Sequence, residues 1–301
     1  MSAPTSAPGP GDDHGVFEAH RARLVGLAYR ITGSRAEADD VVQDAWLRWQ
    51  GTDRSRVENP PAWLTTVTSR LALDHLRSAR VRREAYVGPW LPEAATAEPG
   101  PDERAEVAES VTVGFLAVLE RLGPVERVVF LLADVFGVPF DEISTVVDRS
   151  PEACRQVASR ARRRVREGRP RYAPTDAEAW RVTEAFLGAA AEGDMARLVA
   201  LLAPDAVLTS DGGPHHRAAR LPVEGAERVA RFVLNITQRI VGPDVGVEVR
   251  AINGQPGVVV RAPDGTVLST LAVSVVDGRV DRVWALVNPD KTASLAAPPI
   301  R

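Results

Sequence analysis

The 301-residue chain is poor in cysteine, lysine and long apolar runs, and each shortage excludes something. Its single cysteine, Cys154, cannot form an internal disulfide and suits a reducing compartment, so we expect a cytoplasmic protein. No apolar run is long enough to span a bilayer. The first residues lack the basic segment and apolar stretch of a secretory signal. The sequence thus predicts no membrane partner, and Lys291 is the only lysine among 37 basic residues.

The length, apolar content and arginine distribution are informative. A chain of this length predicts two or three domains, and 45% apolar residues are enough for a packed core. The net charge of −3 alone says nothing about nucleic acid. The arginines, however, gather in two places, at 70–83 and at 155–171.

The first half of the chain has helical spacing and no strand signal. We expect a helix that ends at Gly33-Ser34, a second helix over 35–49, a polar loop over 50–61 and a long helix over 62–84. A connector rich in proline, alanine and glutamate follows. Helical spacing then resumes at about residue 105, and the apolar stretch 125–137 predicts one buried helix.

Residues 138–168 predict a helix-turn-helix. Asp148-Arg149-Ser150 supplies the turn, and Ser150-Pro151 places an N-cap before a proline at the first helical position. The spacing turns one face of the second helix inward and leaves polar side chains outward. In the major groove, arginine can read guanine and glutamine can read adenine. We expect DNA contacts from Glu152, Arg155, Gln156, Ser159, Arg160 and Arg163.

The pattern of apolar residues changes near residue 175, where an expected helix leads into an α+β domain. After a further helix at about 224–240 come alternating apolar runs, divided by Asn253-Gly254, Asp264-Gly265 and Asp277-Gly278. Such dipeptides between β-rich runs are strong hairpin signals. The sequence predicts a domain with helices first and a curved antiparallel sheet after them.

The basic end of the 62–84 helix suggests contacts with single-stranded DNA, because arginine can hold phosphates while aromatic residues stack on bases. The alternative for Trp63 is packing in the core. The preceding helix carries acidic residues that cannot serve DNA. They indicate either solubility or a docking face for a basic protein partner.

These motifs together resemble a known family. ADDVVQDAWLRW, PPAWLTTVTSRLALDHLR and PFDEISTVVDRSPEACRQVASRAR are similar to regions 2 and 4 of sigma-70 initiation factors of the extracytoplasmic-function (ECF) type. The resemblance implies two all-α domains, core RNA polymerase as partner (its large-subunit coiled coil and flap), and promoter DNA. It departs from many relatives at Arg70, where they have Asn.

The resemblance assigns roles to residues. Core polymerase would bind Asp39, Asp40, Gln43, Asp44 and Trp46. The minus-10 element would be read by Asn59, Trp63, Arg70, Asp74, Arg77 and Arg80, and the minus-35 element by the helix-turn-helix residues named above. We expect a disordered N-terminus (1–15), region 2 (16–84), a linker (85–109), region 4 (110–170), a third domain (174–291) and a tail (292–301).

The third domain resembles the cone-shaped SnoaL-like (NTF2-like) fold that a group of these factors carries. WLPEA, DGGP and NPDKT stand where that group has a linker motif, a glycine motif and a terminal motif. We expect this domain to regulate the factor by docking on the linker. The expected contact residues are Trp90, Leu91, Pro92, Glu93, Asp211, Gly212, Gly213, Asn288, Pro289, Asp290 and Lys291. Alternatively, Trp90 packs on the end of the 62–84 helix.

Other functions remain open for the third domain. Asp205, Asp211, His215 and His216 are candidates for acid–base catalysis in an isomerase or cyclase, although each also suits a turn or loop. The cone could bind a small-molecule ligand. No metal site or cofactor is expected, because the histidine pair lacks a third ligand at a recognisable spacing. A one-component regulator with a ligand-binding cone is the rival to an initiation factor.

Overall fold

The computed structural model describes residues 12–84, 86, 88–95, 112–168, 176–214, 216 and 218–295. The chain divides into two compact units. The helical unit comprises 1–80, 100–107 and 122–164, and the sheet unit comprises 81–99, 108–121 and 165–301. Each unit is therefore assembled from segments that are far apart in the sequence.

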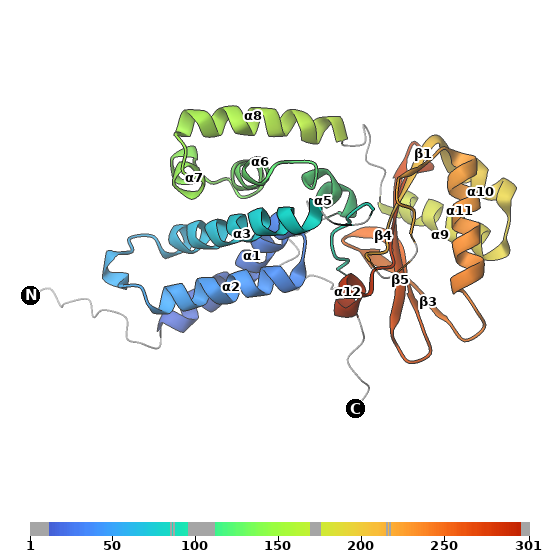
Figure 1. Ribbon diagram of the computed structural model, residues 1–301, viewed down its shortest axis with the longest axis horizontal. Coiled ribbons are helices and arrows are strands. Elements are labelled where there is room, and N and C mark those ends of the chain that lie inside the picture. Colours follow the sequence, from blue (N-terminus) through green and yellow to red (C-terminus); the bar gives the residue numbers. More distant parts are fainter. Residues whose placement is uncertain are drawn as a thin grey trace, which may run out of the picture. The chain divides into compact units, whose positions relative to one another are not determined.

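The helical unit contains the helices of both expected DNA-binding regions (Figure 1). From the first region come α1 (Asp12–Thr32), α2 (Arg35–Gln50), the 3-10 turn η1 (Arg54–Arg56) and most of α3 (Pro60–Glu84). From the second come α6 (Pro124–Phe130), η2 (Leu131–Val135), α7 (Phe140–Val147) and most of α8 (Pro151–Gly168). The all-α prediction for this half is confirmed.

Local signals set the boundary between α1 and α2. Gly33 has a φ of 75°, which ends α1, and its N–H donates to the Tyr29 carbonyl. Ser34 then caps α2, because its hydroxyl accepts from the Glu37 N–H at 3.2 Å. At the other end, α1 begins at Asp12, so residues 12–15 are helical although the sequence was expected to be disordered there.

The apolar stretch 125–137 is not one α-helix. It begins as α6 and continues as η2, a π-helical turn in which the Phe136 N–H donates to the Leu131 carbonyl. Gly137, with a φ of 65°, then ends the segment. Apolar spacing alone does not distinguish the wider turn from an α-helix, which is why the single-helix prediction was wrong.

The helix-turn-helix is confirmed. Asp148 adopts a left-handed conformation (φ 54°) after α7, and the Ser150 hydroxyl accepts from the Ala153 N–H at the start of α8. The buried side of α8 consists of Cys154, Val157, Ala158, Ala161 and Val165. Its apolar face therefore holds the outward face in a fixed orientation.

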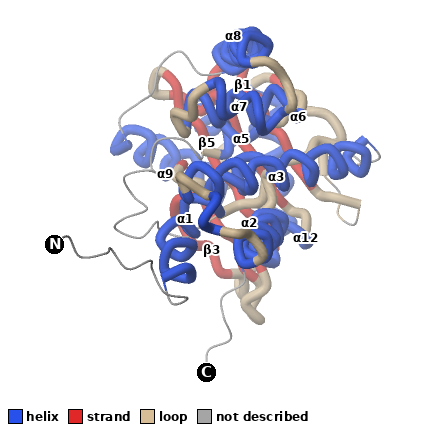
Figure 2. Tube along the Cα trace, turned by 90° about the vertical axis from the view of Figure 1, so that its left-hand side faces the viewer, coloured by secondary structure: helices blue, strands red, loops and turns tan. Residues whose placement is uncertain are grey.

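The sheet unit is an α+β domain, as expected. Its helices are α5 (Val113–Leu119), α9 (Asp176–Glu192), α10 (Met195–Leu201), α11 (Ala226–Ile240) and α12 (Pro289–Thr292), followed by the 3-10 turn η3 (Ala293–Leu295). Its strands are β1 (Leu202–Asp211), β2 (Val223–Glu224), β3 (Gly246–Ile252), β4 (Gln255–Arg261), β5 (Val267–Val276) and β6 (Arg279–Leu286) (Figure 2).

The six strands form one mixed sheet in the order β2-β1-β6-β5-β4-β3. All neighbouring pairs are antiparallel except β1 and β6, which run parallel. The sequence had predicted an antiparallel sheet, and the exception is possible because α11 and four strands (β2, β3, β4 and β5) separate β1 from β6 in the chain. The three predicted hairpin turns all occur, and Asn253-Gly254 and Asp277-Gly278 have positive φ at both residues.

The sheet has two covered faces. Helices α9, α10 and α11 cover one, and their core includes Phe186, Val229, Val273 and Val283. The opposite face is covered by residues 91–94, α5 and η3, whose core includes Leu91, Val113 and Leu295. Leu295 thus belongs to the domain, although the tail was expected to begin at 292.

Candidate nucleic-acid interface and linker-docking site

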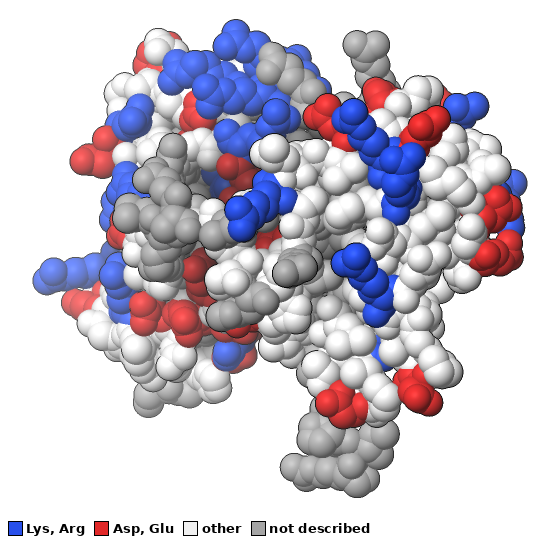
Figure 3. All heavy atoms as spheres, turned by 45° about the vertical axis from the view of Figure 1, so that its right-hand side comes forward, with Lys and Arg blue, Asp and Glu red and all other residues white. Residues whose placement is uncertain are grey.

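The outward face of α8 carries exposed positive charge. All six residues expected to read the minus-35 element are exposed. Figure 3 shows arginine gathered over this helix. Arg155 lies 3.4 Å from Glu152 and stacks on the Phe140 ring, so it is partly held in place.

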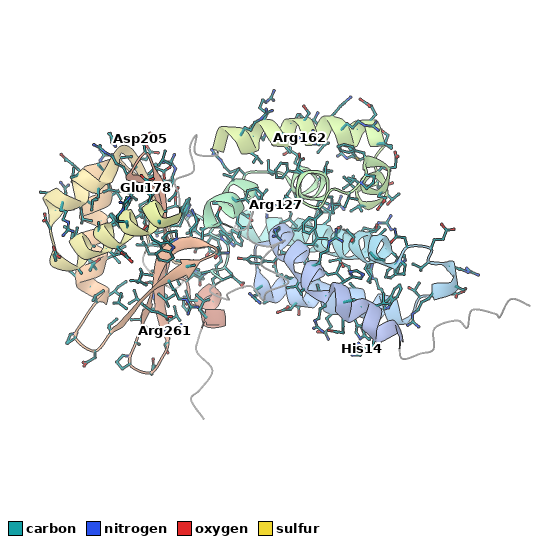
Figure 4. The ribbon with its side chains drawn as sticks, turned by 180° about the vertical axis from the view of Figure 1, so that it is seen from behind. His14, Arg127, Arg162, Glu178, Asp205 and Arg261 are labelled. Carbon is teal, nitrogen blue, oxygen red and sulfur yellow. The ribbon has the colours of Figure 1, made fainter. Side chains whose placement is uncertain are left out.

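Two other arginines of α8 serve the fold. Arg162 forms an ion pair with Asp134 at 2.7 Å, and Arg164 pairs with Glu126 at 2.5 Å. Glu126 lies in α6 and Asp134 in η2. Figure 4 labels Arg162 on α8. Charge along α8 is therefore divided between an outward set and a set that fastens the helix to its own domain.

The start of α3 is built by Asn59 and Trp63. The Asn59 side-chain oxygen accepts from the Ala62 N–H at 3.1 Å and so caps the helix. The ring centres of Trp63 and Trp49 are 5.3 Å apart. The guanidinium group of Arg54, in η1, stacks on the Trp49 ring. The packing alternative considered for Trp63 is thus what this structure contains.

The exposed side of α3 carries Arg70, Asp74 and Arg77, three more of the expected minus-10 residues. Arg70 donates to the Thr145 carbonyl, and Asp74 pairs with Arg77 at 3.4 Å. The Arg80 side chain lies outside the described residues. The structure therefore places three of the expected residues along one helix surface, with Arg70 already in contact with α7.

The acidic face of α2 is exposed at Asp39, Asp40, Gln43 and Asp44. Trp46 is half-buried against the Phe17 ring at 4.8 Å. Leu47, beside it, is 56% exposed and was not among the expected residues. A single exposed leucine is ordinary on a protein surface, so the exposure of this face is compatible with both solvation and a protein partner.

Asp211 is the centre of the linker-docking site in the sheet unit. It is 1% exposed at the end of β1. Its two oxygens accept from the Tyr86 hydroxyl (2.5 Å), the Leu91 N–H (2.8 Å), the Gly213 N–H (3.0 Å) and Lys291 Nζ (2.6 Å). One buried carboxylate therefore joins the linker to two other segments of the domain.

Lys291 completes this site. Its ammonium group also donates to the Leu91 carbonyl at 2.5 Å, and it lies 3.8 Å from the centre of the Trp90 ring. The same Lys291 nitrogen lies 5.1 Å from the centre of the Tyr86 ring. Lys291 is only 7% exposed, so its charge is balanced by a carboxylate and two aromatic faces in place of water.

The glycines of the DGG stretch are required by close packing. A Cβ at Gly212 would lie 2.5 Å from the His216 carbonyl oxygen. A Cβ at Gly213, where φ is 61°, would lie 2.7 Å from the Asn288 side chain. Asn288 can therefore reach the Tyr86 hydroxyl, to which it donates at 2.8 Å.

The other expected contact residues differ in exposure. Pro92 and Glu93 are buried, whereas Pro289 and Asp290 are exposed in the first turn of α12, with the Asp290 N–H capped by Asn288. The structure thus brings together Trp90, Leu91, Asp211, Asn288 and Lys291, and leaves Pro289 and Asp290 at the edge.

Sequence reasoning missed three docking residues. Tyr86 was not among the expected contact residues, although a tyrosine four residues before Trp90 is a chemically suitable donor to a buried acid. Asn253 exchanges two hydrogen bonds with Ala95, each 2.8 Å long. Gln255 accepts from the Gly114 N–H at 3.2 Å, which also ties α5 to the sheet. Asn253 was interpreted only as a turn residue, so its hydrogen bonds to the linker were not expected.

The environment of Tyr86 perturbs its acidity. Burial is the largest cause, and the adjacent Asp211 carboxylate adds to it, so the pKa of the Tyr86 hydroxyl is raised well above its ordinary value. The protonated hydroxyl is the form that can donate to Asp211. The docked linker therefore keeps this phenol neutral.

The candidate catalytic residues do not converge. Asp205 is exposed at the outer edge of the domain (Figure 4), and His216 is exposed in a loop. His215 lies outside the described residues. Asp211 pairs in register with Leu286, whose side chain lies in the core beneath the linker. It therefore faces the linker and not the core under α9–α11.

Among the described residues, no helix is both long and apolar enough to cross a membrane. The same part of the chain holds no group of three or more histidine, cysteine or acidic side chains arranged to bind a metal ion.

Comparison with known proteins agrees with the two helical regions. Residues 16–82 match the family described as Sigma-70 region 2, and residues 113–165 match Sigma-70, region 4. The ECF RNA polymerase sigma factor SigJ of Mycobacterium tuberculosis is 41% identical over 91% of each chain. A probable ECF RNA polymerase sigma factor of that organism, SigI, is 34% identical over 94% of this chain and 95% of its own.

A solved structure extends this likeness to three dimensions. The crystal structure of the M. tuberculosis SigJ sigma factor has a TM-score of 0.74 and 36% identity, covering 96% of this chain and all of that one. The likeness spans both the helices and the sheet, so the rival interpretation as a one-component regulator is not supported. The chain belongs to the ECF RNA polymerase sigma factors.

Proposed function

We propose that the sheet unit regulates this alternative sigma factor by holding the linker between regions 2 and 4. The observation that carries the proposal is the buried Asp211–Lys291 pair, which clasps the backbone of Leu91 on both its N–H and its carbonyl. These two contacts are to the Leu91 backbone and do not depend on its side chain. The domain therefore fixes the path of the linker backbone at this residue.

Both ends of the connector are held on the same sheet. Residues 86–95 follow α3 directly, and α5 precedes the helices of region 4. Val113 of α5 and Leu91 share one apolar core against the sheet. A domain that anchors both ends of a linker limits the separations that regions 2 and 4 can adopt, which is a means of control.

The sites expected in regions 2 and 4 complete the proposal. The acidic face of α2, with Leu47, would dock on the coiled coil of the large polymerase subunit, and region 4 on its flap. The exposed side of α3 would read the minus-10 element. The outward face of α8 would read the minus-35 element, because its exposed arginines suit phosphates and base edges.

The test is in vitro transcription with core polymerase on sheared genomic DNA, with sequencing of the transcript starts. The full chain, Lys291→Met, Arg239→Met and a chain ending at Tyr172 are compared. Arg239 is an exposed arginine of α11 and controls for loss of one charge in the same domain.

We expect Lys291→Met to change the rate of specific initiation, because breaking one partner of a buried pair leaves an uncompensated carboxylate and releases Leu91. Arg239→Met should behave as the full chain does. If Lys291→Met and the truncated chain both initiate as the full chain does, regulation by docking is wrong. If no protein initiates specifically, the promoter-reading role itself fails.

A further inference from the structure

Strand β3 forms one edge of the six-stranded sheet, because among the described residues it pairs only with β4. The other edge is β2, which is only two residues long. Proteins often keep an edge strand short, since its unpaired backbone groups can recruit a further strand. β3 is seven residues long, from Gly246 to Ile252, and contains neither proline nor lysine. It therefore lacks the usual protection of an edge.

The hairpin between β3 and β4 determines which backbone groups of β3 point outward. Its two-residue turn, Asn253-Gly254, is closed by the pair Ile252–Gln255. The pair that closes such a turn exchanges two hydrogen bonds, and every second pair along the strands repeats this pattern. Pro256, which has no N–H, falls in the next pair, as this alternation requires. The residues of β3 whose N–H and carbonyl groups point away from β4 are therefore Val247, Val249 and Ala251.

One face of this edge is apolar. Val247 is 51% exposed and Val249 is 48% exposed, and Ala251 is exposed as well. Val247 and Val249 pair with Val260 and Val258 of β4, which are both buried. The apolar surface of the sheet thus continues to its edge, where a further strand would cover it.

The opposite face of the edge carries one charge of each sign. Glu248 lies 2.9 Å from Arg250 on the same strand and 3.6 Å from Arg261 of β4, which Figure 4 labels. Within one chain, such pairs at the surface contribute little to stability. Their positions matter more to an added strand, because Glu248 and Arg250 stand symmetrically on either side of Val249.

The sequence of β3 is self-complementary when a second copy pairs with it in the antiparallel direction. A two-fold axis at Val249 places this residue opposite its counterpart and Val247 opposite Ala251. These are the residues with outward backbone groups, so they form the hydrogen-bonded pairs. Glu248 then stands opposite Arg250 in the intervening pairs, where side chains lie closest. An axis at Glu248 or at Arg250 would instead place like charges opposite each other.

We propose that β3 is a homodimer interface, through which two copies of this chain pair antiparallel about a two-fold axis at Val249 and join their two sheets into one. Backbone direction and side-chain charge select the same axis. A second copy is the partner that these observations favour, because a two-fold contact uses both charges twice and closes on two chains. A peptide from another protein could use the same backbone groups, but it would require no symmetry about Val249.

The test is sedimentation velocity of the full chain over a range of concentrations, without polymerase or DNA. Glu248→Arg and Arg250→Glu are measured separately and as an equimolar mixture. Either variant alone would place like charges opposite each other across the axis. In a mixed dimer, every charge again stands opposite one of the other sign. The control is Glu224→Arg, which reverses an exposed glutamate on the other edge of the sheet.

We expect the unaltered chain and the control to form dimers with the same dissociation constant. Each charge variant alone should have a dissociation constant at least about tenfold higher, because two attractive cross-strand pairs become repulsive. The mixture should regain the dimer. The ion pair within each chain stays broken in both variants, so recovery in the mixture could arise only from contact between copies.

Val249→Pro is a further variant that does not depend on charge. It removes the N–H group at the proposed axis, and proline is tolerated on an edge strand where that group faces outward. We expect this variant to lose the dimer, and melting by circular dichroism verifies that each variant folds. If Val249→Pro does not fold, the two charge variants still decide the matter.

An unaltered chain that stays monomeric at every concentration would overturn the interface. Folded charge variants that dimerise as tightly as the unaltered chain, or a control that loses the dimer, would also overturn it. A mixture that dimerises no better than its two components would exclude the axis at Val249. Failure here is separable from failure of linker regulation, because these measurements use neither polymerase nor Lys291→Met.

Discussion

At the scale of single residues, the docking of the linker on the sheet unit depends on a few charged groups removed from water. Asp211 accepts four hydrogen bonds within one site. Lys291 has nearly all of its surface covered by that carboxylate, the Leu91 carbonyl and two aromatic rings. Such a pair adds little net stability over apolar packing, but it is costly to leave half-made. It therefore favours one docked position of the linker.

The Tyr86 hydroxyl makes the stability of the docking site depend on pH in the alkaline range. Because its pKa is raised in the folded chain, its contribution to stability is complete below the unfolded pKa of about 10 and is lost as pH rises further. We expect Tyr86→Phe to lower the free energy of unfolding by about 1 kcal/mol at neutral pH. The difference from the unaltered chain should shrink above about pH 10.

Thermal melts of both proteins across this pH range check the expectation, and absorbance at the phenolate band reports which tyrosines ionise. Tyr29, which is 8% exposed, remains in both proteins as an internal reference. A Tyr86→Phe protein whose deficit is the same at neutral and alkaline pH would show that the hydroxyl does not titrate with docking.

At the scale of elements, α8 separates two uses of arginine along one helix. Arg163 is exposed on the outward face, while its neighbour Arg162 is paired with Asp134 of η2. Adjacent positions on a helix point about 100° apart, so the same residue type can serve DNA or the fold.

This separation predicts opposite results for neighbouring substitutions. Arg163→Ala should weaken binding to a minus-35 duplex and reduce the dependence of log affinity on log salt by about one, with little effect on melting. Arg162→Ala should lower the melting temperature and alter the salt dependence less. Anisotropy titrations at several salt concentrations measure this, and equal salt slopes for the two variants would contradict the division.

The elements that the sequence predicted are those with local causes. Ser34 and Ser150 cap their helices, and the Asn-Gly and Asp-Gly dipeptides make the hairpin turns, because each acts on residues within a few positions. The π-helical turn η2 and the parallel pairing of β1 with β6 depend on distant packing. Neither feature leaves a signature in local spacing. The predictions of one helix over 125–137 and of an antiparallel sheet were therefore wrong.

At the scale of the whole chain, the docking contacts join residues far apart in sequence. Tyr86 and Asp211 are 125 positions apart, and Leu91 and Lys291 are 200 apart. No periodicity connects such residues, so the contact set could be anticipated only from resemblance to a family. The buried residues Arg30 and Arg127 were missed for a related reason, since arginine in a helix normally indicates an exposed face.

The single lysine makes linker docking measurable by chemistry. An amine-reactive ester can modify only the amino terminus and Lys291, and Lys291 must leave its carboxylate and rings before its nitrogen can attack. We expect Lys291 to be acylated far more slowly than a lysine introduced by Arg239→Lys on exposed α11. Mass spectrometry of peptides over time would give the fraction of chains that are undocked. Equal rates at the two sites would mean that the linker is released most of the time.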